Sequence, residues 1–476
     1  MVAASLARER IYSSDSLQSL KEVLVPARLN DLGAVAALNR RSSKSFVERT
    51  LSPITAGGLR QSIMTLVQTS LGGGVLTLAF AMKLSGLGLG CVLLVVLGLV
   101  AFLGMDVMMR GAVQLGAADT ATLLAKCVGG WSGPVMDFML VLYGNGAAIA
   151  FFIFLGDFLP AVTKDLVLVA GITPLEVQPQ VLRMRCILAT LLCIVPLSIP
   201  RKLSVLRFTS PIALVAILFT ALIVLCKCPE LFAMHIGRKG FGEIQWVNID
   251  WGFFQAFSVL LFAYNCHLNV VPVTTELTDP SDARIEKVAF RVMLVELVFY
   301  SLIAVSGYLS FLGLTDQNIL QGYGTSSAIT MCRAGLSLTI LLAIPTSNLP
   351  TVMSLMGLLR LLLPVRSRAP GSAPLLPADG SNAEADLRGP DAMRFAVTAV
   401  CLAAQVSAAI AVPNVADVMG LLGASVGTVL MMVLPLMVLL KTRPKRYSTA
   451  RFWFTAILLS AGTVISLASI VVILGK

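Results

Sequence analysis

The sequence predicts an all-α polytopic membrane protein with eleven transmembrane helices. Of its 476 residues, 57% are hydrophobic and 13% are charged, whereas soluble domains carry about 25% charged residues. Apolar runs of about 20 residues, the length that crosses a bilayer as a helix, recur along the whole chain. The expected spans are 61–82, 86–110, 133–160, 184–200, 207–227, 252–275, 288–313, 328–359, 394–412, 418–440 and 452–474.

The distribution of positive charge predicts the orientation of these spans. The formal net charge is +11, and most Lys and Arg residues share one side if the N-terminus is cytoplasmic. Cytoplasmic loops carry such an excess, so we expect the C-terminus outside or in an organelle lumen. Arg333 enters the eighth span from the outer side, and we expect it to extend to the interface. The charge then faces anionic lipid, and no nucleic-acid partner is needed.

Two polar segments divide the chain into domains. Residues 1–59 are basic and Ser-rich, which predicts a disordered cytoplasmic tail. Residues 364–394 are rich in Pro, Ala, Gly and Asp, which predicts a flexible cytoplasmic linker. We expect spans one to five in residues 60–227, spans six to ten in 252–440, and the eleventh span with a short outer C-terminus in 452–476.

Composition and motifs exclude several functional classes. The nine cysteines lack the spacing of a metal site or a disulfide framework. No nucleophile elbow, His-rich cluster or phosphate-binding loop is present. We therefore expect no enzymatic activity and no cofactor apart from a coupling ion, with the lipid bilayer and a small substrate as partners of a monomer.

Three consecutive glycines, Gly72, Gly73 and Gly74, stand within the first expected span. Glycine is among the poorest helix formers, and unwound backbone is tolerated at membrane depth only where protein or a water-filled cavity satisfies it. A helix broken there exposes a half-helix N-terminus that attracts a carboxylate, while the preceding half attracts a cation. One break could therefore hold both ends of a zwitterion. Close helix packing through small residues is the alternative.

The sixth expected span carries a second interruption. Asn265, His267 and Asn269 break its apolar run, and Pro272 follows, which removes a backbone donor and clashes with the preceding turn. Paired interruptions in corresponding positions of two halves indicate a transporter site between inverted repeats. We therefore expect a 5+5 inverted repeat plus one extra helix, working as a secondary active transporter by alternating access.

Several segments resemble a known family. LGGGVLTLAFAM (71–82) and FAYNCHLNVVPVTTEL (262–277) resemble the first and sixth spans of the amino acid/auxin permease family, and its sodium-coupled neutral amino acid transporter branch in particular. FIFLGDFLP (152–160), GYLSF (307–311) and DVMGLLGASVGTVLMMVLP (417–435) resemble its third, seventh and tenth spans. The resemblance implies a LeuT-type fold with eleven spans, and transport of amino acids coupled to Na⁺ or H⁺.

The substrate site is expected at the two breaks and the third span. Backbone groups and hydroxyls of the first break would hold the α-amino and α-carboxyl groups, and the other two segments would form the opposite wall. The expected residues are Thr69, Ser70, Gly72, Gly73, Gly74, Tyr143, Asn145, Tyr264, Asn265 and Cys266. For Asn145, an interhelical hydrogen bond is the open alternative. A site of backbone and small residues suits neutral amino acids.

Ionisable residues in apolar runs are candidates for coupling or gating. His267 could carry a proton, because histidine titrates near physiological pH, or it could cap the broken helix. Asp106 lies one helical turn from Arg110 and could pair with it, and Asp157 could belong to an extracellular gate. The other acids in apolar runs are Asp137 and Glu296.

The residues expected at a cation site depart from the sodium-coupled branch. That branch carries an Asn where this chain has Gln68, and threonines where it has Leu341 and Ala343; Thr339, one turn from Ala343, could substitute. Apolar side chains offer no oxygen ligands for Na⁺. We therefore expect proton-coupled or uncoupled transport, in the plasma membrane or an acidic organelle membrane. An amino-acid-sensing transceptor that signals through its N-terminal tail is the alternative.

Overall fold

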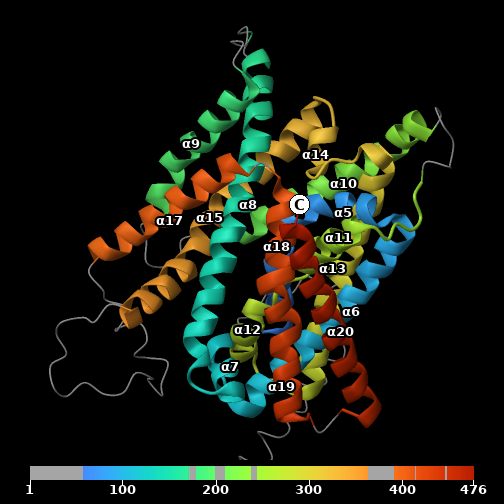
Figure 1. Cartoon of the computed structure of the whole chain (residues 1–476). Helices are drawn as coiled ribbons and strands as arrows, with labels where there is room; N and C mark the ends of the chain where they lie inside the picture. The colour runs from blue at the N-terminus through green and yellow to red at the C-terminus, as the bar shows by residue number, and fades with distance from the viewer. Residues whose placement is uncertain are drawn as a thin grey trace, which may run out of the picture. The chain divides into compact units, whose positions relative to one another are not determined.

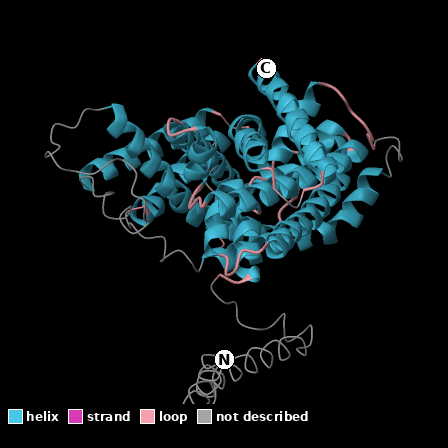
Figure 2. Ribbon diagram, turned by 90° about the horizontal axis from the view of Figure 1, so that it is seen from below, coloured by secondary structure: helices cyan, strands magenta, loops and turns pink. Residues whose placement is uncertain are grey.

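The computed structural model describes residues 57–169, 171, 178–198, 209–236, 244–362, 391–412, 414–444 and 447–475. The expected tail up to residue 56, and the expected linker from 364 to 390, lie outside the described residues. The chain divides into two units, Met1–Thr55 and Ala56–Lys476, and only the second is described here. Within the described part of the chain, all regular elements are helical (Figure 2).

The described residues form an all-α polytopic membrane protein. Ten of their helices are long and apolar enough to cross a membrane, or eleven if one bent pair counts as a single span. The unbroken long helices are α6 (Leu87–Leu115), α8 (Ser132–Val169), α9 (Pro179–Leu197), α10 (Thr209–Ile236), α13 (Asp282–Phe311), α15 (Ser327–Leu362), α17 (Asp391–Ala411) and α20 (Thr449–Leu474).

The bent pair is the expected first span. Helix α4 (Leu59–Ser70) ends before the glycines, a short 3-10 segment η1 (Gly73–Thr77) follows, and α5 (Leu78–Ser85) completes the span. The halves Leu59–Ser70 and Gly74–Ser85 meet at 52°. At Gly72 the backbone is extended, with φ −99° and ψ −155°. The predicted interruption at the glycines is confirmed.

The expected sixth span is interrupted as well. Helix α11 (Trp251–Ala263) stops before the polar residues, the 3-10 turn η4 (His267–Asn269) follows, and α12 (Val270–Glu276) completes the span. Pro272 lies in the first turn of α12, where its missing N–H costs no intrahelical hydrogen bond. The proline therefore fits the start of the second half of the span, and the interruption itself lies before it.

Two features of the fold differ from expectation or were not foreseen. The third span was expected to end at residue 160, but α8 continues through Pro160 to Val169, because neighbouring helices can compensate a proline in a membrane helix.

The tenth span consists of α18 (Val415–Leu422), two π-helical segments, η6 (Gly423–Gly427) and η7 (Val429–Val433), and α19 (Leu434–Thr442). A Cβ on Gly423 would lie 2.0 Å from the Ser258 carbonyl oxygen, so this glycine permits the close approach of η6 to α11.

Short elements complete the described chain. Helix α7 (Thr120–Val128) begins at Asp119, whose carboxylate accepts a hydrogen bond from the Thr122 N–H. Helix α14 (Ile319–Gly322) follows the 3-10 turn η5 (Leu312–Leu314). The sequence analysis did not predict these elements, because each is too short to show a hydrophobic period.

Helices α8 and α15 form an extensive contact, and the two cross in the view of Figure 1. A Cβ on Gly144 would lie 1.8 Å from the Thr351 hydroxyl, so the missing side chain allows the two helices to approach. Helix α13 packs against α4, α5, α6 and α10. Helix α13 therefore packs against both halves of the first broken span, while α11 of the second broken span packs against α5, α18 and α20.

Candidate substrate-binding site

A cavity of about 720 Å³ is lined by both broken spans. The first break contributes residues from Thr65 to Leu76, and the second contributes residues from Phe262 to Asn269. Helices α8, α10 and α15 supply most of the remaining wall, and no charged side chain is among the described residues that line it. The volume lies within the range of about 300–1,000 Å³ that small-molecule sites occupy.

The structure brings together most, but not all, of the residues predicted for the site. On the cavity wall lie Gln68, Thr69, Ser70, Gly72, Gly74, Tyr143, Asn265 and Thr339. Away from the wall lie Asn145, Tyr264, Cys266, His267, Asp106 and Asp157. Gly73 stands between two lining glycines, at the start of η1.

The two described lining glycines of the first break differ in their surroundings. No heavy atom lies within 4 Å of the place where a Cβ on Gly72 would stand, so Gly72 borders open space. A Cβ on Gly74 would lie 3.4 Å from the Ala263 Cα. Both roles considered for the glycines, an open backbone at a ligand site and close helix packing, are therefore present. Gly72 leaves room in the cavity, and Gly74 permits close packing on α11.

The hydroxyls at the end of α4 are already used as donors. Ser70 Oγ donates to the Val67 carbonyl at 2.9 Å, and Thr69 Oγ1 donates to the Thr65 carbonyl at 2.8 Å. Both oxygens keep lone pairs, so they can accept a hydrogen bond but have no free proton to give. At this wall a protonated amino group is a better match than a carboxylate.

Asn265 has an unused donor in the second break. Its side chain is 3% exposed, its Oδ1 accepts a hydrogen bond of 3.3 Å from the His267 N–H, and its Nδ2 has no hydrogen-bond partner. A buried polar group without a partner costs about 1–3 kcal/mol. Asn265 lines the cavity, but its Nδ2 is itself buried and lies towards η6, 3.5 Å from the place of a Cβ on Gly427, so it reaches a ligand only when the side chain turns.

His267 is fully buried beside α6 and does not cap the break. A Cβ on Gly104 would lie 2.8 Å from its Nε2, and neither ring nitrogen makes a hydrogen bond of normal geometry in the described structure. The cap of the broken helix is the Asn265 side chain instead. A proton-carrying role for His267 stays a prediction.

Two aromatic rings meet at the cavity wall. The ring centroids of Tyr143 and Phe262 lie 6.0 Å apart with the planes tilted by 37°, and both residues line the cavity. This contact joins α8 to the end of α11 and gives the site an apolar surface. The sequence analysis missed Phe262, which reads as one more apolar residue of its span.

Asn145 takes part in an interhelical network. Its Oδ1 accepts a hydrogen bond of 2.9 Å from Gln405 Nε2, and the same nitrogen donates to Asn348 Oδ1 at 2.8 Å. The network links α8, α15 and α17, and Gln405 and Asn348 are both buried. The alternative left open for Asn145, an interhelical hydrogen bond, is what the structure shows.

Asp106 belongs to a buried ionic network, as its pairing with Arg110 predicted. Asp106 Oδ2 accepts hydrogen bonds from Arg110 Nε at 2.9 Å, the Tyr447 hydroxyl at 2.7 Å and Arg451 at 3.2 Å. Arg110 also pairs with Asp282. Burial, and then the neighbouring Asp106 carboxylate, raise the pKa of Tyr447, so its hydroxyl stays protonated and remains a donor.

Asp157 lies at a junction of three elements. Its Oδ2 accepts a hydrogen bond of 3.2 Å from Asn318 Nδ2, just before α14, and its Oδ1 lies 3.8 Å from Arg183 Nε of α9. These contacts join α8 to α9 and α14. A gating role for Asp157 stays a prediction.

The expectation that Arg333 extends to the interface is wrong. Its side chain is buried, and its guanidinium donates to the carbonyls of Leu320 at 2.9 Å and Tyr323 at 2.8 Å. Carbonyls at the end of a helix lack intrahelical donors, and α14 offers them within reach. Arg333 therefore holds the α14 segment against α15.

Comparison with known proteins agrees with this architecture. An amino acid transporter candidate named AAT1 from Toxoplasma gondii is 34% identical over 75% of this chain and 49% of its own length. Vacuolar amino acid transporter 5 of Schizosaccharomyces pombe is 29% identical over 58% and 66%. Sodium-coupled neutral amino acid transporter 7 of Xenopus laevis is 25% identical over 61% and 64%. The matched part of this chain thus spans about half the length of the Toxoplasma relative.

A crystal structure of a manganese transporter from Eremococcus coleocola covers 87% of this chain with a TM-score of 0.46 and 13% identity. The family match is broader, since the family described as transmembrane amino acid transporter proteins matches residues 55–476. The predicted resemblance to the amino acid/auxin permease family is thereby confirmed, and the chain belongs to the transmembrane amino acid transporter protein family.

Proposed function

We propose that this chain transports neutral amino acids across a membrane by alternating access. The observation that carries the proposal is the cavity between the two interrupted spans, which is large enough for one amino acid and has no charged lining side chain. Family membership supports an amino acid as the substrate class. Coupling to protons, or uncoupled movement, fits the site better than coupling to sodium.

The substrate zwitterion would lie between the two breaks. A helix that starts afresh at Gly73 leaves its first N–H groups without intrahelical acceptors, and these suit a carboxylate. The free Asn265 amide suits the same carboxylate from the second break. The lone pairs of Ser70 and Thr69, whose protons are already donated, suit the ammonium group.

The remaining wall supports a neutral substrate side chain. Tyr143 and Phe262 and the facing part of α15 offer mostly apolar surface. A charged substrate side chain would be buried without a partner, which costs several kcal/mol. The nearby acids do not change this, because Asp106 is paired with Arg110 and Glu296 does not line the cavity.

The positions that would form a Na⁺ site in the sodium-coupled branch supply few oxygen ligands in this chain. Ala343 lines the cavity and offers no side-chain oxygen. Thr339 lines it too, and its hydroxyl, which donates to the Gly335 carbonyl at 2.9 Å, keeps lone pairs, but it supplies a single oxygen where Na⁺ needs several. These positions favour proton-coupled or uncoupled movement. Relatives named vacuolar in two yeasts support an acidic organelle membrane as the site of action.

Transport by the purified chain in liposomes tests the proposal. Uptake of a labelled mixture of neutral L-amino acids would be measured against a competition panel of all twenty amino acids, with Na⁺ or choline at fixed pH. We expect neutral amino acids to compete, Lys and Glu to compete at least tenfold more weakly, and choline to change uptake less than twofold. Uptake that requires Na⁺, or a preference for charged substrates, would contradict the proposal.

A further inference from the structure

A buried carboxyl group without a charged partner stands behind the two breaks. Glu296 lies in the middle of α13, is 0% exposed and forms no ion pair within the described part of the chain. The Ser70 hydroxyl faces it but donates its proton to the Val67 carbonyl. Neither carboxyl oxygen therefore has a hydrogen-bond partner. The mechanism outlined above makes no use of this group.

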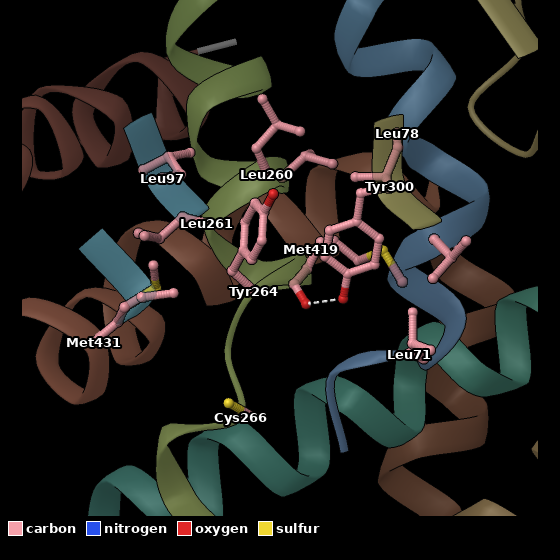
Figure 3. Close-up of a cluster of buried hydrophobic side chains, with 14 of the residues drawn as sticks. Leu71, Leu78, Leu97, Leu260, Leu261, Tyr264, Cys266, Tyr300, Met419 and Met431 are labelled. Atoms are coloured by element: carbon pink, nitrogen blue, oxygen red, sulfur yellow. Dashed lines mark hydrogen bonds between the residues drawn. The ribbon is translucent and has the colours of Figure 1, made fainter. Parts of the chain in front are cut away.

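The surroundings of Glu296 connect it to both interrupted spans. Ser70, the last residue of α4, is its neighbour from the first break. Tyr264 and Cys266 are its neighbours from the second break. Tyr300 lies one turn further along α13. The Tyr264 and Tyr300 rings pack edge to face with centroids 4.9 Å apart, and Figure 3 shows them side by side, with Cys266 set apart below them.

Only one layer of residues separates this carboxyl from the cavity. Ser70 faces Glu296 on one side and lines the cavity on the other. Tyr300 donates a hydrogen bond of 2.7 Å to the Ala263 carbonyl, and Ala263 also lines the cavity. A movement that opens either break would bring water from the cavity to the carboxyl.

The groups facing Glu296 leave it in its neutral form in this conformation. The titratable ones are Tyr300 on its own helix and Tyr264 and Cys266 from the second break, all uncharged at physiological pH. Helix α4 presents Ser70, and among the described residues of the other elements that pack on α13, which are η1, η5, α5, α6 and α10, no charged group acts on Glu296. Because an isolated carboxylate is very costly in such a site, the carboxyl keeps its proton.

We propose that Glu296 is the proton-binding group that couples amino acid movement to a proton gradient, an inference that rests on the proposed transport function. When the breaks open to the acidic side, a hydronium ion gives its proton to a Glu296 oxygen and leaves as water. When they open to the other side, the O–H bond breaks and the proton passes to cavity water. The same two breaks hold the zwitterion, so both ions are bound and released by one movement.

The experiment compares Glu296→Gln with a matched variant in liposomes without Na⁺. Gln keeps the shape of the neutral carboxyl but cannot titrate. Glu230→Gln removes an exposed carboxylate of α10 and serves as the control. Three quantities are measured with a labelled mixture of neutral L-amino acids: exchange without a gradient, accumulation under an inward acid gradient, and proton entry, which a pH dye reports.

We expect Glu296→Gln to keep exchange within about threefold of the original chain and to lose both gradient-driven accumulation and amino-acid-dependent proton entry, while Glu230→Gln keeps all three. Accumulation and proton entry that survive in Glu296→Gln would overturn the inference and leave transport standing. Exchange by the original chain without any proton entry would also overturn the inference and leave transport standing. Absence of exchange in the original chain would instead refute the proposed function, and the inference with it.

A second variant keeps the test decisive if Gln impairs folding. Glu296→Asp retains a titratable carboxyl but withdraws it by one methylene from Ser70. We expect proton-driven accumulation to persist in this variant, with the pH of half-maximal uptake displaced by at least half a pH unit. A pH profile identical to that of the original chain would contradict the role assigned to Glu296.

Discussion

The Asn269 side-chain amide donates a hydrogen bond of 2.9 Å to the Thr69 hydroxyl, which joins the second half of the broken sixth span to the first half of the broken first span. At the other end of these halves, the Thr278 N–H and hydroxyl donate to the Gly57 carbonyl at 2.9 and 2.8 Å. Helices α4 and α12 are therefore tied together at both ends, and we expect them to move as one unit during transport.

Mutating both ends of this link should show coupling. We expect Thr69→Val and Asn269→Leu to be non-additive in a double-mutant cycle of thermal unfolding, by about 0.6 kcal/mol and at most about 1.7 kcal/mol, the range found for hydrogen bonds between membrane helices. Thr163→Val removes a comparable hydroxyl of α8, which donates to its own helix, and should be additive with Asn269→Leu. If the losses in unfolding free energy were additive in both cycles, the hydrogen bond between Asn269 and Thr69 would not couple the two spans.

Filling the space at Gly72 should block transport. Because nothing lies within 4 Å of a Cβ at this position, Gly72→Leu places its side chain in the cavity without a backbone clash. We expect uptake to fall at least tenfold at an unchanged amount of folded protein. Gly130→Leu, at another glycine with open space around it, is the control and should transport normally. Normal uptake by Gly72→Leu would show that the substrate lies elsewhere.

The free donor of Asn265 should contribute to affinity. Asn265→Asp keeps the oxygen that accepts from the His267 N–H but removes the donor, and Asn265→Ala removes both. A hydrogen bond to a charged group contributes about 1.5–3 kcal/mol, which corresponds to a KM increase of at least about tenfold. We expect that increase in both variants. An increase in Asn265→Ala alone would mean that the amide serves only as a cap.

Asn145 should behave as a structural residue. Since its side-chain oxygen accepts from Gln405, we expect Asn145→Ala to lower the free energy of unfolding by about 0.6–1.7 kcal/mol. Its KM should stay within twofold of the original value. A tenfold rise of KM at unchanged stability would place the residue in the substrate site after all.

The network around Asp106 should contribute to stability. Asp106→Asn leaves Arg110 and Arg451 facing a neutral group, and breaking a buried ion pair costs about 3–5 kcal/mol. Tyr447→Phe removes one hydrogen bond from the same carboxylate and should cost about 1 kcal/mol. Thermal unfolding measures both. A smaller loss for Asp106→Asn than for Tyr447→Phe would contradict the importance of the charge.

The sequence was sufficient for features that depend on local residue type. Hydrophobic runs located the helices, and the glycines and the Asn265–Asn269 cluster located both breaks, because backbone propensity acts over a few residues. The 52° bend and the neighbours of each break depend on tertiary packing and could not be foreseen. Tyr447 lies 341 residues beyond Asp106 in the chain, a separation over which no sequence pattern predicts contact.

Glu296 illustrates the same limit. Its sequence marks it as an acid in an apolar run, one of several. Only the fold shows that Asp106 has cationic partners while Glu296 stands between two breaks with none in the described chain. The functional difference between the two acids therefore lies in their surroundings, which the chain order does not reveal.

The central claim is that a zwitterion is bound by the two interrupted spans together. A structure of the chain in lipid nanodiscs, determined with a saturating neutral amino acid, tests it most directly. The account predicts substrate density with a carboxylate oxygen within about 2.7–3.2 Å of both Asn265 Nδ2 and an N–H of the Gly73–Gly74 segment. Density outside this cavity, or a first span that runs through Gly72 as a continuous helix around bound substrate, would contradict it.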